Sequence, residues 1–289
     1  MRLESVHCRG VHAADYSLAP MPAPITLCGS LSQVASPLGR AMHEAGYRAL
    51  GLAFTYVPFE VPELAAAIGG MRALGIRGFG VSQPFKEQVV PLLDALDPVA
   101  ERIGAVNTIV NDGGRLVGHN TDWVGATRAL EEVRPLAGAR VLVLGAGGAA
   151  RAIAFGLRER EASVTIANRD RARAERLASG TGARAILFDD AAVAAADHDI
   201  VVNATSLGQA PAVAQLPLPG AALRAGQVVM DIVYKPLRTA FVVAAKERGA
   251  LAIDGGRMLL HQGAAQFELY TGHAAPLEAM QAALRATIG

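Results

Sequence analysis

Short apolar runs alternate with helical patterns along the chain from Ile25 onward. In the first half, continuous or alternating apolar positions predict strands, and apolar positions three and four residues apart predict helices. The expected strands are 25–30, 52–59 and 76–82, and the expected helices are 37–50, 61–75, 84–96 and 121–133. Residues 105–120 are typical of a hairpin, because Asp112-Gly113-Gly114 favours a tight turn between two apolar runs.

The second half differs, because its strands are continuous apolar runs. Residues 140–145 form one such run, which predicts a strand buried on both faces, as in a parallel sheet. Further strands are expected at 163–169, 199–205, 228–234 and 250–255, and helices at 146–159, 170–180, 237–249 and, as a pair, 258–288. Strand–helix alternation with short connections predicts a doubly wound sheet.

These patterns predict an α/β protein with two lobes. Residues 25–122 form the expected first α/β domain, and residues 123–257 form a Rossmann-type doubly wound domain. The helices of 258–289 are expected to pack back toward the first lobe and complete it, and 1–24 is expected to be a loosely ordered leader. A cleft between two lobes is the usual place for a cofactor and a small-molecule substrate.

The composition narrows the possible partners. A chain of 289 residues suits about two domains, and a net charge of +1 offers no basic field for nucleic acid or an acidic membrane surface. The chain has no apolar run of roughly 18 residues to span a membrane and no signal peptide. Cys8 and Cys28 give neither a disulfide framework nor a zinc site, so we expect no metal and a cytoplasmic setting. A monomer and a homodimer are both left open.

A glycine-rich segment follows the strand at 140–145 and opens the next helix. It fits the dinucleotide-binding pattern G-x-G-x-x-G/A in its required context, through Gly145, Ala146, Gly147, Gly148, Ala149 and Ala150. Gly145 allows the tight turn, and Gly147 lets the backbone approach a pyrophosphate at the helix N-terminus, where free N–H groups favour negative charge. A plain tight turn is the alternative.

The end of the next strand bears on the choice of cofactor. NAD needs an acidic side chain there, but this strand ends in Asn168 and Arg169, and Arg173 follows. Guanidinium groups match phosphate geometry, so the two arginines favour the 2′-phosphate of NADP. Asp170 would repel that phosphate unless it caps the next helix. The alternative is that the arginines only solvate the start of a helix.

Four short segments combine polar side chains with strand ends and tight turns, at 82–86, 105–108, 118–122 and 261–263. Taken singly, each has a structural explanation. Lys86 suits a solvated helix, Asp122 a helix cap, Asn107 a strand-end turn and Gln262 an exposed position. Their weight comes from their occurrence together.

Together with the glycine-rich segment, they resemble the shikimate dehydrogenase family from about Leu27 to Gly272. The motifs that carry the resemblance are GVSQPFKE, IGAVNTIV, LVGHNTD, VLVLGAGGAARAI, NRDRARAERLA, VVNATSLG, DIVYKP and DGGRMLLHQGAAQFELYTG. The resemblance implies NADP-dependent, reversible reduction of 3-dehydroshikimate to shikimate, a step of the chorismate pathway toward aromatic amino acids. Alternatives are a dehydrogenase of quinate or another cyclic hydroxy acid, and a weakly active NADP-binding sensor or interaction protein.

The resemblance also implies roles for individual residues. Lys86 and Asp122 are the implied catalytic pair, acting as acid and base. The implied substrate contacts are Ser82, Asn107, Tyr234 and Gln262. The implied cofactor contacts are Gly145 to Ala149 at the pyrophosphate, Asn168, Arg169 and Arg173 at the adenosine, and Thr205, Ile232, Gly255 and Met258 at the nicotinamide.

The serine segment departs from the family pattern Ser-x-Ser-Pro, whose two hydroxyls hold the substrate carboxylate. Alignment on Ser36 and the proline after it places Val34 where the first serine belongs, whereas alignment on the strand end makes Ser30 and Ser32 the candidates. Both alignments alter carboxylate recognition. GGRML replaces the usual GLGML, so Arg257 is expected to bring a positive charge near the nicotinamide or substrate. These departures look like the divergent shikimate dehydrogenase-like branch.

Overall fold

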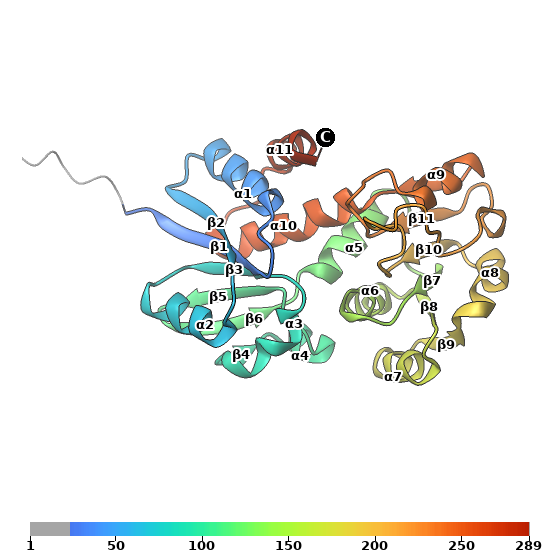
Figure 1. The fold of residues 1–289 in the computed structure, drawn as a ribbon, viewed down its shortest axis with the longest axis horizontal. Helices are drawn as coiled ribbons and strands as arrows, with labels where there is room; N and C mark the ends of the chain where they lie inside the picture. The colour runs from blue at the N-terminus through green and yellow to red at the C-terminus, as the bar shows by residue number, and fades with distance from the viewer. Residues whose placement is uncertain (1–23, 289) are drawn as a thin grey trace, which may run out of the picture.

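The computed structural model describes residues 24–288, and the predicted leader at 1–24 lies outside this part except for Pro24. Two six-stranded sheets lie side by side along the long axis of the molecule (Figure 1). The first sheet has the order β2-β1-β3-β5-β6-β4 and the second β12-β11-β10-β7-β8-β9. This arrangement confirms the predicted fold class of two α/β lobes.

The first sheet is mixed. Its strands are β1 (Thr26–Ser32), β2 (Phe54–Glu60), β3 (Gly78–Val81), β4 (Ala95–Leu96), β5 (Thr108–Asp112) and β6 (Arg115–His119). β1 pairs in parallel with β2 and β3, whereas β5 pairs antiparallel with β3 and β6. The helices of this lobe are α1 (Pro37–Ala49), α2 (Leu64–Ala73), α3 (Phe85–Gln88) and α4 (Pro98–Ile103). The β5–β6 pair is the predicted hairpin.

The second sheet is entirely parallel, as its continuous apolar strands predict. Its strands are β7 (Arg140–Leu144), β8 (Ser163–Asn168), β9 (Arg184–Leu187), β10 (Ile200–Asn203), β11 (Val228–Asp231) and β12 (Leu251–Ile253). Its helices are α6 (Gly148–Glu159), α7 (Arg171–Thr181), α8 (Ala191–Ala194) and α9 (Ala240–Glu247). The strands after β7 are added on one side, as β8 and β9, and those from β10 onward on the other side of β7, which is the strand order of a Rossmann sheet.

Two helices connect the lobes. α5 (Asp122–Glu131) and α10 (Gly255–Thr271) cross in the middle of the molecule (Figure 1). Gly125 permits the crossing, because a Cβ there would lie 2.7 Å from the carbonyl oxygen of Met258. α10 then runs into the first lobe, and it packs there with α11 (Leu277–Ile288) and α1, as the tail was predicted to do.

The predicted helix at 84–96 is wrong in extent. Only α3 forms, followed by a short 3-10 turn at Val90–Leu92 and by β4, which pairs with β6. Pro91 explains the break, since proline lacks the N–H that a helix interior needs. The pattern also missed α4, α8 and β9, which are short. Within residues 24–288, no helix is both long and apolar enough to cross a membrane.

Candidate active site

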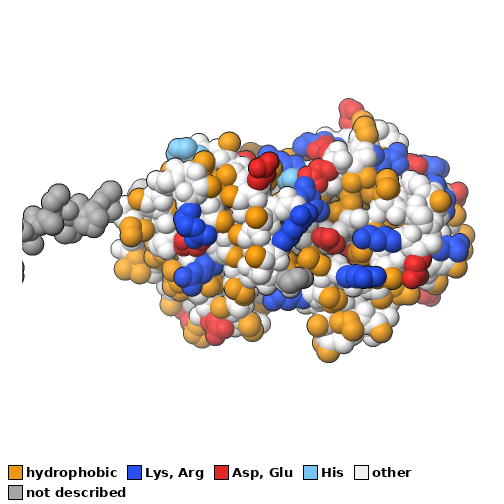
Figure 2. Space-filling model, turned by 90° about the horizontal axis from the view of Figure 1, so that it is seen from above, with side chains coloured by type: hydrophobic (Ala, Val, Ile, Leu, Met, Phe, Trp, Pro, Cys, Tyr) orange, Lys and Arg blue, Asp and Glu red, His pale blue; other side chains and the backbone are white. Residues whose placement is uncertain are grey.

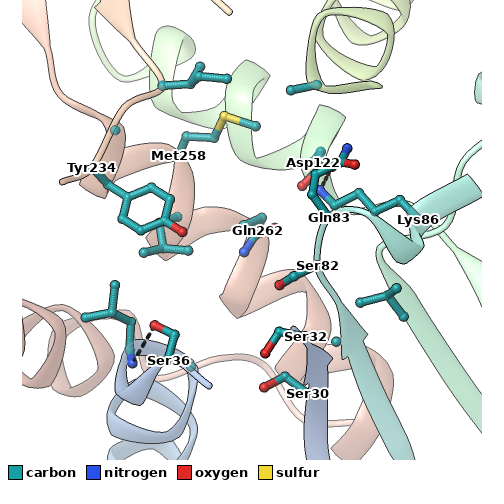
Figure 3. A pocket seen from close by; sticks show the side chains of 18 of the residues that line it. Ser30, Ser32, Ser36, Ser82, Gln83, Lys86, Asp122, Tyr234, Met258 and Gln262 are labelled. Atoms are coloured by element: carbon teal, nitrogen blue, oxygen red, sulfur yellow. Dashed lines mark hydrogen bonds and ion pairs between the residues drawn. The ribbon is translucent and has the colours of Figure 1, made fainter. Parts of the chain in front are cut away.

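A cavity of about 660 Å³ lies where the two lobes meet (Figure 3). The first lobe contributes its wall from the ends of β1 and β3, including Ser32 and Ser82. The second lobe contributes the loops after β7, β10 and β11, including Gly147, Thr205 and Val233. All five strands point their carboxyl ends at the cavity, which is where open α/β sheets bind ligands.

Charged side chains are spread over the face of the molecule seen in Figure 2, with lysines and arginines on both lobes.

The cavity itself holds one close pair of opposite charges, Lys86 and Asp122. The Lys86 Nζ lies 2.6 Å from the Asp122 Oδ2, and their side chains are 16% and 5% exposed. Lys86 projects from α3, and Asp122 is the first residue of α5, where the helix dipole favours a negative charge. Because both side chains are largely removed from water, each charge needs the other.

Asn107 is buried behind this pair and hydrogen-bonds to its carboxylate. Its Nδ2 donates to the Asp122 Oδ1 at 2.9 Å, to Thr121 Oγ1 at 3.0 Å and to the Gln262 Oε1 at 3.1 Å. Its Oδ1 accepts from the Thr121 backbone N–H at 2.7 Å. Asn107 is only 1% exposed and does not line the cavity, so in this structure it orients Asp122 and Gln262. Gln262 lines the cavity, with its Nε2 free to face it.

Both alignments of the serine segment bring hydroxyls to the cavity. Ser30 and Ser32 lie on β1, and they and Ser82 lie on one side of it, below the Lys86–Asp122 pair in Figure 3. Ser36 also lines the cavity and caps α1, where its Oγ accepts from the Leu38 N–H at 3.5 Å. The Ser32 hydroxyl donates to the Val34 carbonyl at 2.9 Å.

One section of the second-lobe wall, at the glycine loop, consists of backbone. Gly145 has a φ of +107°, which a side chain rarely adopts, and a Cβ there would lie 3.0 Å from the Ala204 carbonyl oxygen. Gly147 precedes α6 without any side-chain cap, so N–H groups of the first turn are left for a ligand. A Cβ on Gly147 would meet nothing within 4 Å. This open helix N-terminus fits a dinucleotide pyrophosphate.

The adenosine-end residues lie beside the cavity and do not line it. Asp170 caps α7, where its carboxylate accepts from the Arg173 N–H at 3.0 Å, as one of the two sequence interpretations holds. Arg173 Nε donates to the Ala146 carbonyl at 2.9 Å, which ties α7 to the glycine loop. Arg169 is exposed and Asn168 Nδ2 donates to the Asp170 carbonyl.

The predicted nicotinamide-end residues all line the cavity; they are Thr205, Ile232, Gly255 and Met258. Tyr234 projects from the same side, opposite Gln262 in Figure 3. A buried network that the sequence did not reveal supports their loops. The Asp231 carboxylate accepts from Asn203 at 2.9 Å and from Thr239 at 2.6 Å. Burial raises the pKa of Asp231 against the effect of these hydrogen bonds.

Arg257 does not bring a free positive charge to the cavity. Its guanidinium is hydrogen-bonded to the Glu132 carboxylate, which also accepts from the His261 Nε2 at 2.9 Å. Burial opposes ionisation of Glu132, but the hydrogen bonds from Arg257 and His261 outweigh it and lower the pKa of that carboxyl. The hydrogen bonds of Glu132 with Arg257 and His261 join the end of α5 to α10, near the crossing of these helices.

The predictions missed several polar residues of the cavity wall, namely Gln33, Tyr56, Gln83, Ser206, Gln209, Lys235 and Gln266. Gln266 had a signal, since it lies four residues after Gln262 and so on the same face of the helix. Gln83 stands within the motif GVSQPFKE. Tyr56 reaches the cavity from β2, and its hydroxyl packs against Gly39 and Gly80.

Three family models match the chain. They are described as the shikimate dehydrogenase substrate binding domain at residues 28–109, shikimate / quinate 5-dehydrogenase at 127–232 and the shikimate 5'-dehydrogenase C-terminal domain at 255–285. A curated relative, the shikimate dehydrogenase (NADP(+)) of Moorella thermoacetica, is 47% identical, over 88% of this chain and 89% of its own.

Solved structures are similar over the whole described fold. Shikimate 5-dehydrogenase from Thermus thermophilus, in complex with NADP(H) and shikimate, has a TM-score of 0.84 and 37% identity, over 91% of this chain and 100% of its own. The ligand-free 5-ketofructose reductase of Gluconobacter sp. strain CHM43 has a TM-score of 0.83 and 35% identity, over 92% of this chain and 99% of its own.

Proposed function

This chain belongs to the shikimate dehydrogenase family, and on that premise we propose that it reversibly reduces 3-dehydroshikimate to shikimate with NADP. The observation that carries the proposal is the Lys86–Asp122 ion pair, which faces the same cavity as the open N-terminus of α6. Curated relatives with 43–47% identity are named for this NADP-dependent oxidoreductase activity. The pair lies between the first-lobe wall and the glycine loop. This position suits an acid and base in ketone reduction.

Reduction of a ketone requires a hydride at carbon and a proton at oxygen. NADP, when bound, supplies the hydride chemistry. The Lys86 ammonium polarises the substrate carbonyl and delivers the proton, and Asp122 keeps the ammonium charged and oriented. In the direction of alcohol oxidation the same pair accepts the hydroxyl proton. Asn107 fixes the carboxylate through the hydrogen bond to its Oδ1.

The remaining roles follow the two walls. The loop after β7 and the start of α6, Gly145 to Ala149, would hold the pyrophosphate. Arg169 and Arg173 would favour the 2′-phosphate, and Asn168 would border the adenosine. Thr205, Ile232, Gly255 and Met258 would hold the nicotinamide. The substrate contacts are Ser30, Ser32, Ser36, Ser82, Tyr234 and Gln262. The domain bounds, the cytoplasmic location and the choice between monomer and homodimer stay predictions.

A steady-state assay tests this function. Shikimate and quinate are each offered with NADP and with NAD, and NADPH or NADH formation is followed by absorbance. We expect turnover with shikimate and NADP to exceed every other combination. Quinate is the second candidate, because the family model over residues 127–232 is described for both substrates. NADP binding without shikimate-dependent NADPH formation at millimolar substrate would refute the proposal.

A further inference from the structure

Three tyrosines pack together in the core of the first lobe, and their hydroxyls have different surroundings. Tyr47, Tyr56 and Tyr270 belong to one buried cluster, together with side chains of β1, α1 and α10. The hydroxyls of Tyr47 and Tyr270 are buried, and neither residue lines the cavity. Tyr56 lines the cavity, although the residue is only 2% exposed. Tyr56 is therefore the tyrosine of this cluster that a bound substrate can meet.

Tyr56 is fixed in place with its hydroxyl at the cavity. Its ring stacks on the buried ring of His43, with the centroids 4.5 Å apart and an interplanar angle of 8°. Its backbone N–H donates to the Glu44 carboxylate of α1 at 2.8 Å. A Cβ on Gly39 or on Gly80, which both line the cavity, would lie 3.1 or 3.2 Å from the Tyr56 hydroxyl. The two glycines thus leave room for the hydroxyl to reach the cavity.

The space beside Gly80 is bordered by a donor and an acceptor. A Cβ there would lie 3.2 Å from the Tyr56 hydroxyl and 3.5 Å from Gln266 Oε1. Gln266 Nε2 donates to the Asn107 carbonyl and to Thr108 Oγ1, so its Oε1 is left as an acceptor. A hydroxyl group of a ligand both donates and accepts, and can therefore pair with the phenol and with the amide oxygen.

We propose that Tyr56 is a substrate-binding residue, whose hydroxyl forms a hydrogen bond with a ring hydroxyl of the substrate in the space beside Gly80. This inference rests on the proposed function, since the Lys86–Asp122 pair acts on the same ring. Asp122 takes its hydrogen bonds from Lys86 and Asn107, so loss of the Tyr56 hydroxyl leaves the acid and base in place. Its loss should weaken binding of the ground state and of the transition state alike.

The variant Tyr56→Phe removes this hydroxyl and keeps the ring that stacks on His43. With saturating NADP, we expect the KM for shikimate to rise about tenfold, equivalent to about 1.4 kcal/mol, while kcat stays within about twofold of wild type. Tyr47→Phe is the matched control, because it removes a buried hydroxyl from the same cluster, and its KM should equal that of wild type.

Two results of this comparison would overturn the inference: a wild-type KM in Tyr56→Phe, or an equal rise of KM in both variants. Either result leaves the proposed function standing, because wild-type turnover is unaffected by it. Absence of shikimate-dependent turnover in the wild-type enzyme would refute the proposed function, and this inference with it.

The variant Gly80→Ala tests the same contact from β3. Its methyl group would occupy the space assigned to the substrate hydroxyl, 3.2 Å from the Tyr56 hydroxyl and 3.4 Å from Gln266 Nε2. The KM for shikimate should rise about tenfold or more, and KM does not depend on the fraction of enzyme that folds. Gly69→Ala on α2, where a Cβ would meet nothing within 4 Å, should keep the wild-type KM. A wild-type KM in Gly80→Ala would overturn the placement of a substrate hydroxyl beside Gly80.

Discussion

The two walls of the cavity are built by different means. The second-lobe wall contains a section of backbone, made of glycines at a strand end and the uncapped first turn of α6. The first-lobe wall consists of side chains from separate segments, and the buried Asn107 behind it hydrogen-bonds to Asp122 and Gln262. A backbone wall suits the pyrophosphate common to all dinucleotides, whereas a side-chain wall can change its substrate through single substitutions. The departures from the family pattern accordingly gather on the first-lobe wall and around α10.

Gly147→Val should break the backbone wall alone. Gly147 has an extended conformation that valine adopts, and its Cβ would meet nothing within 4 Å, so folding should be unaffected. The side chain would occupy the approach to the helix N-terminus, and we expect the Kd for NADP, measured by calorimetric titration, to rise about a hundredfold. Gly180→Val on α7, also in open space, should leave the Kd unchanged. Wild-type affinity in Gly147→Val would disprove the placement of the pyrophosphate.

His43→Phe should change stability behind the side-chain wall. His43 is fully buried against the ring of Tyr56, and burial lowers its pKa from 6.5 to about 3. Between these values the unfolded chain binds one proton more, so this residue makes stability fall as pH falls below about 6.5. Phenylalanine has no proton to bind, so it removes the effect. Between pH 7 and pH 5, the free energy of unfolding of wild type should fall by about 2 kcal/mol relative to that of the variant.

Urea unfolding at several pH values measures this difference. His273→Phe serves as the control, because His273 is exposed and its replacement should keep the wild-type slope of stability against pH. Parallel pH profiles for wild type and His43→Phe would show that His43 is not buried as a neutral side chain.

Arg169→Gln should have the smallest effect, because it alters a side chain at the edge of the backbone wall. Arg169 is exposed and directly follows β8, so the fold should be unaffected. Loss of one charge-assisted phosphate contact should lower the preference for NADP over NAD about tenfold. The ratio of kcat/KM values measures it, and Arg171→Gln, whose arginine pairs with Glu175, is the control. A ratio unchanged in Arg169→Gln would place the 2′-phosphate elsewhere.

The sequence predicts a contiguous segment better than a group of residues that are distant in sequence. The glycine loop was predictable because strand, turn and helix are contiguous, and each has a local signal. The two lobes were predictable from periodicity. The helix at 84–96 was predicted too long, because Pro91 inside the segment lacks the N–H that a helix interior needs. The Lys86–Asp122 pair came only from the resemblance, since 36 residues separate its members.

Contacts over long sequence separations had no local signal. Gln262 meets Asn107 across 155 residues, and Arg257 meets Glu132 across 125. The sequence therefore suggested a charge from Arg257 in the cavity, whereas folding pairs it with a carboxylate that only the tertiary structure brings near. The buried network of Asp231 and Asn203 was missed for the same reason, because each residue alone resembles an ordinary strand end.

The most direct test of the division between the walls is Lys86→Met, assayed for both turnover and cofactor binding. Methionine keeps most of the unbranched side chain and removes the ammonium. We predict that shikimate-dependent NADPH formation falls about a thousandfold, as loss of a general acid and base implies, while the Kd for NADP stays within about twofold of wild type. Turnover close to wild type would contradict the assignment of the chemistry to the Lys86–Asp122 pair.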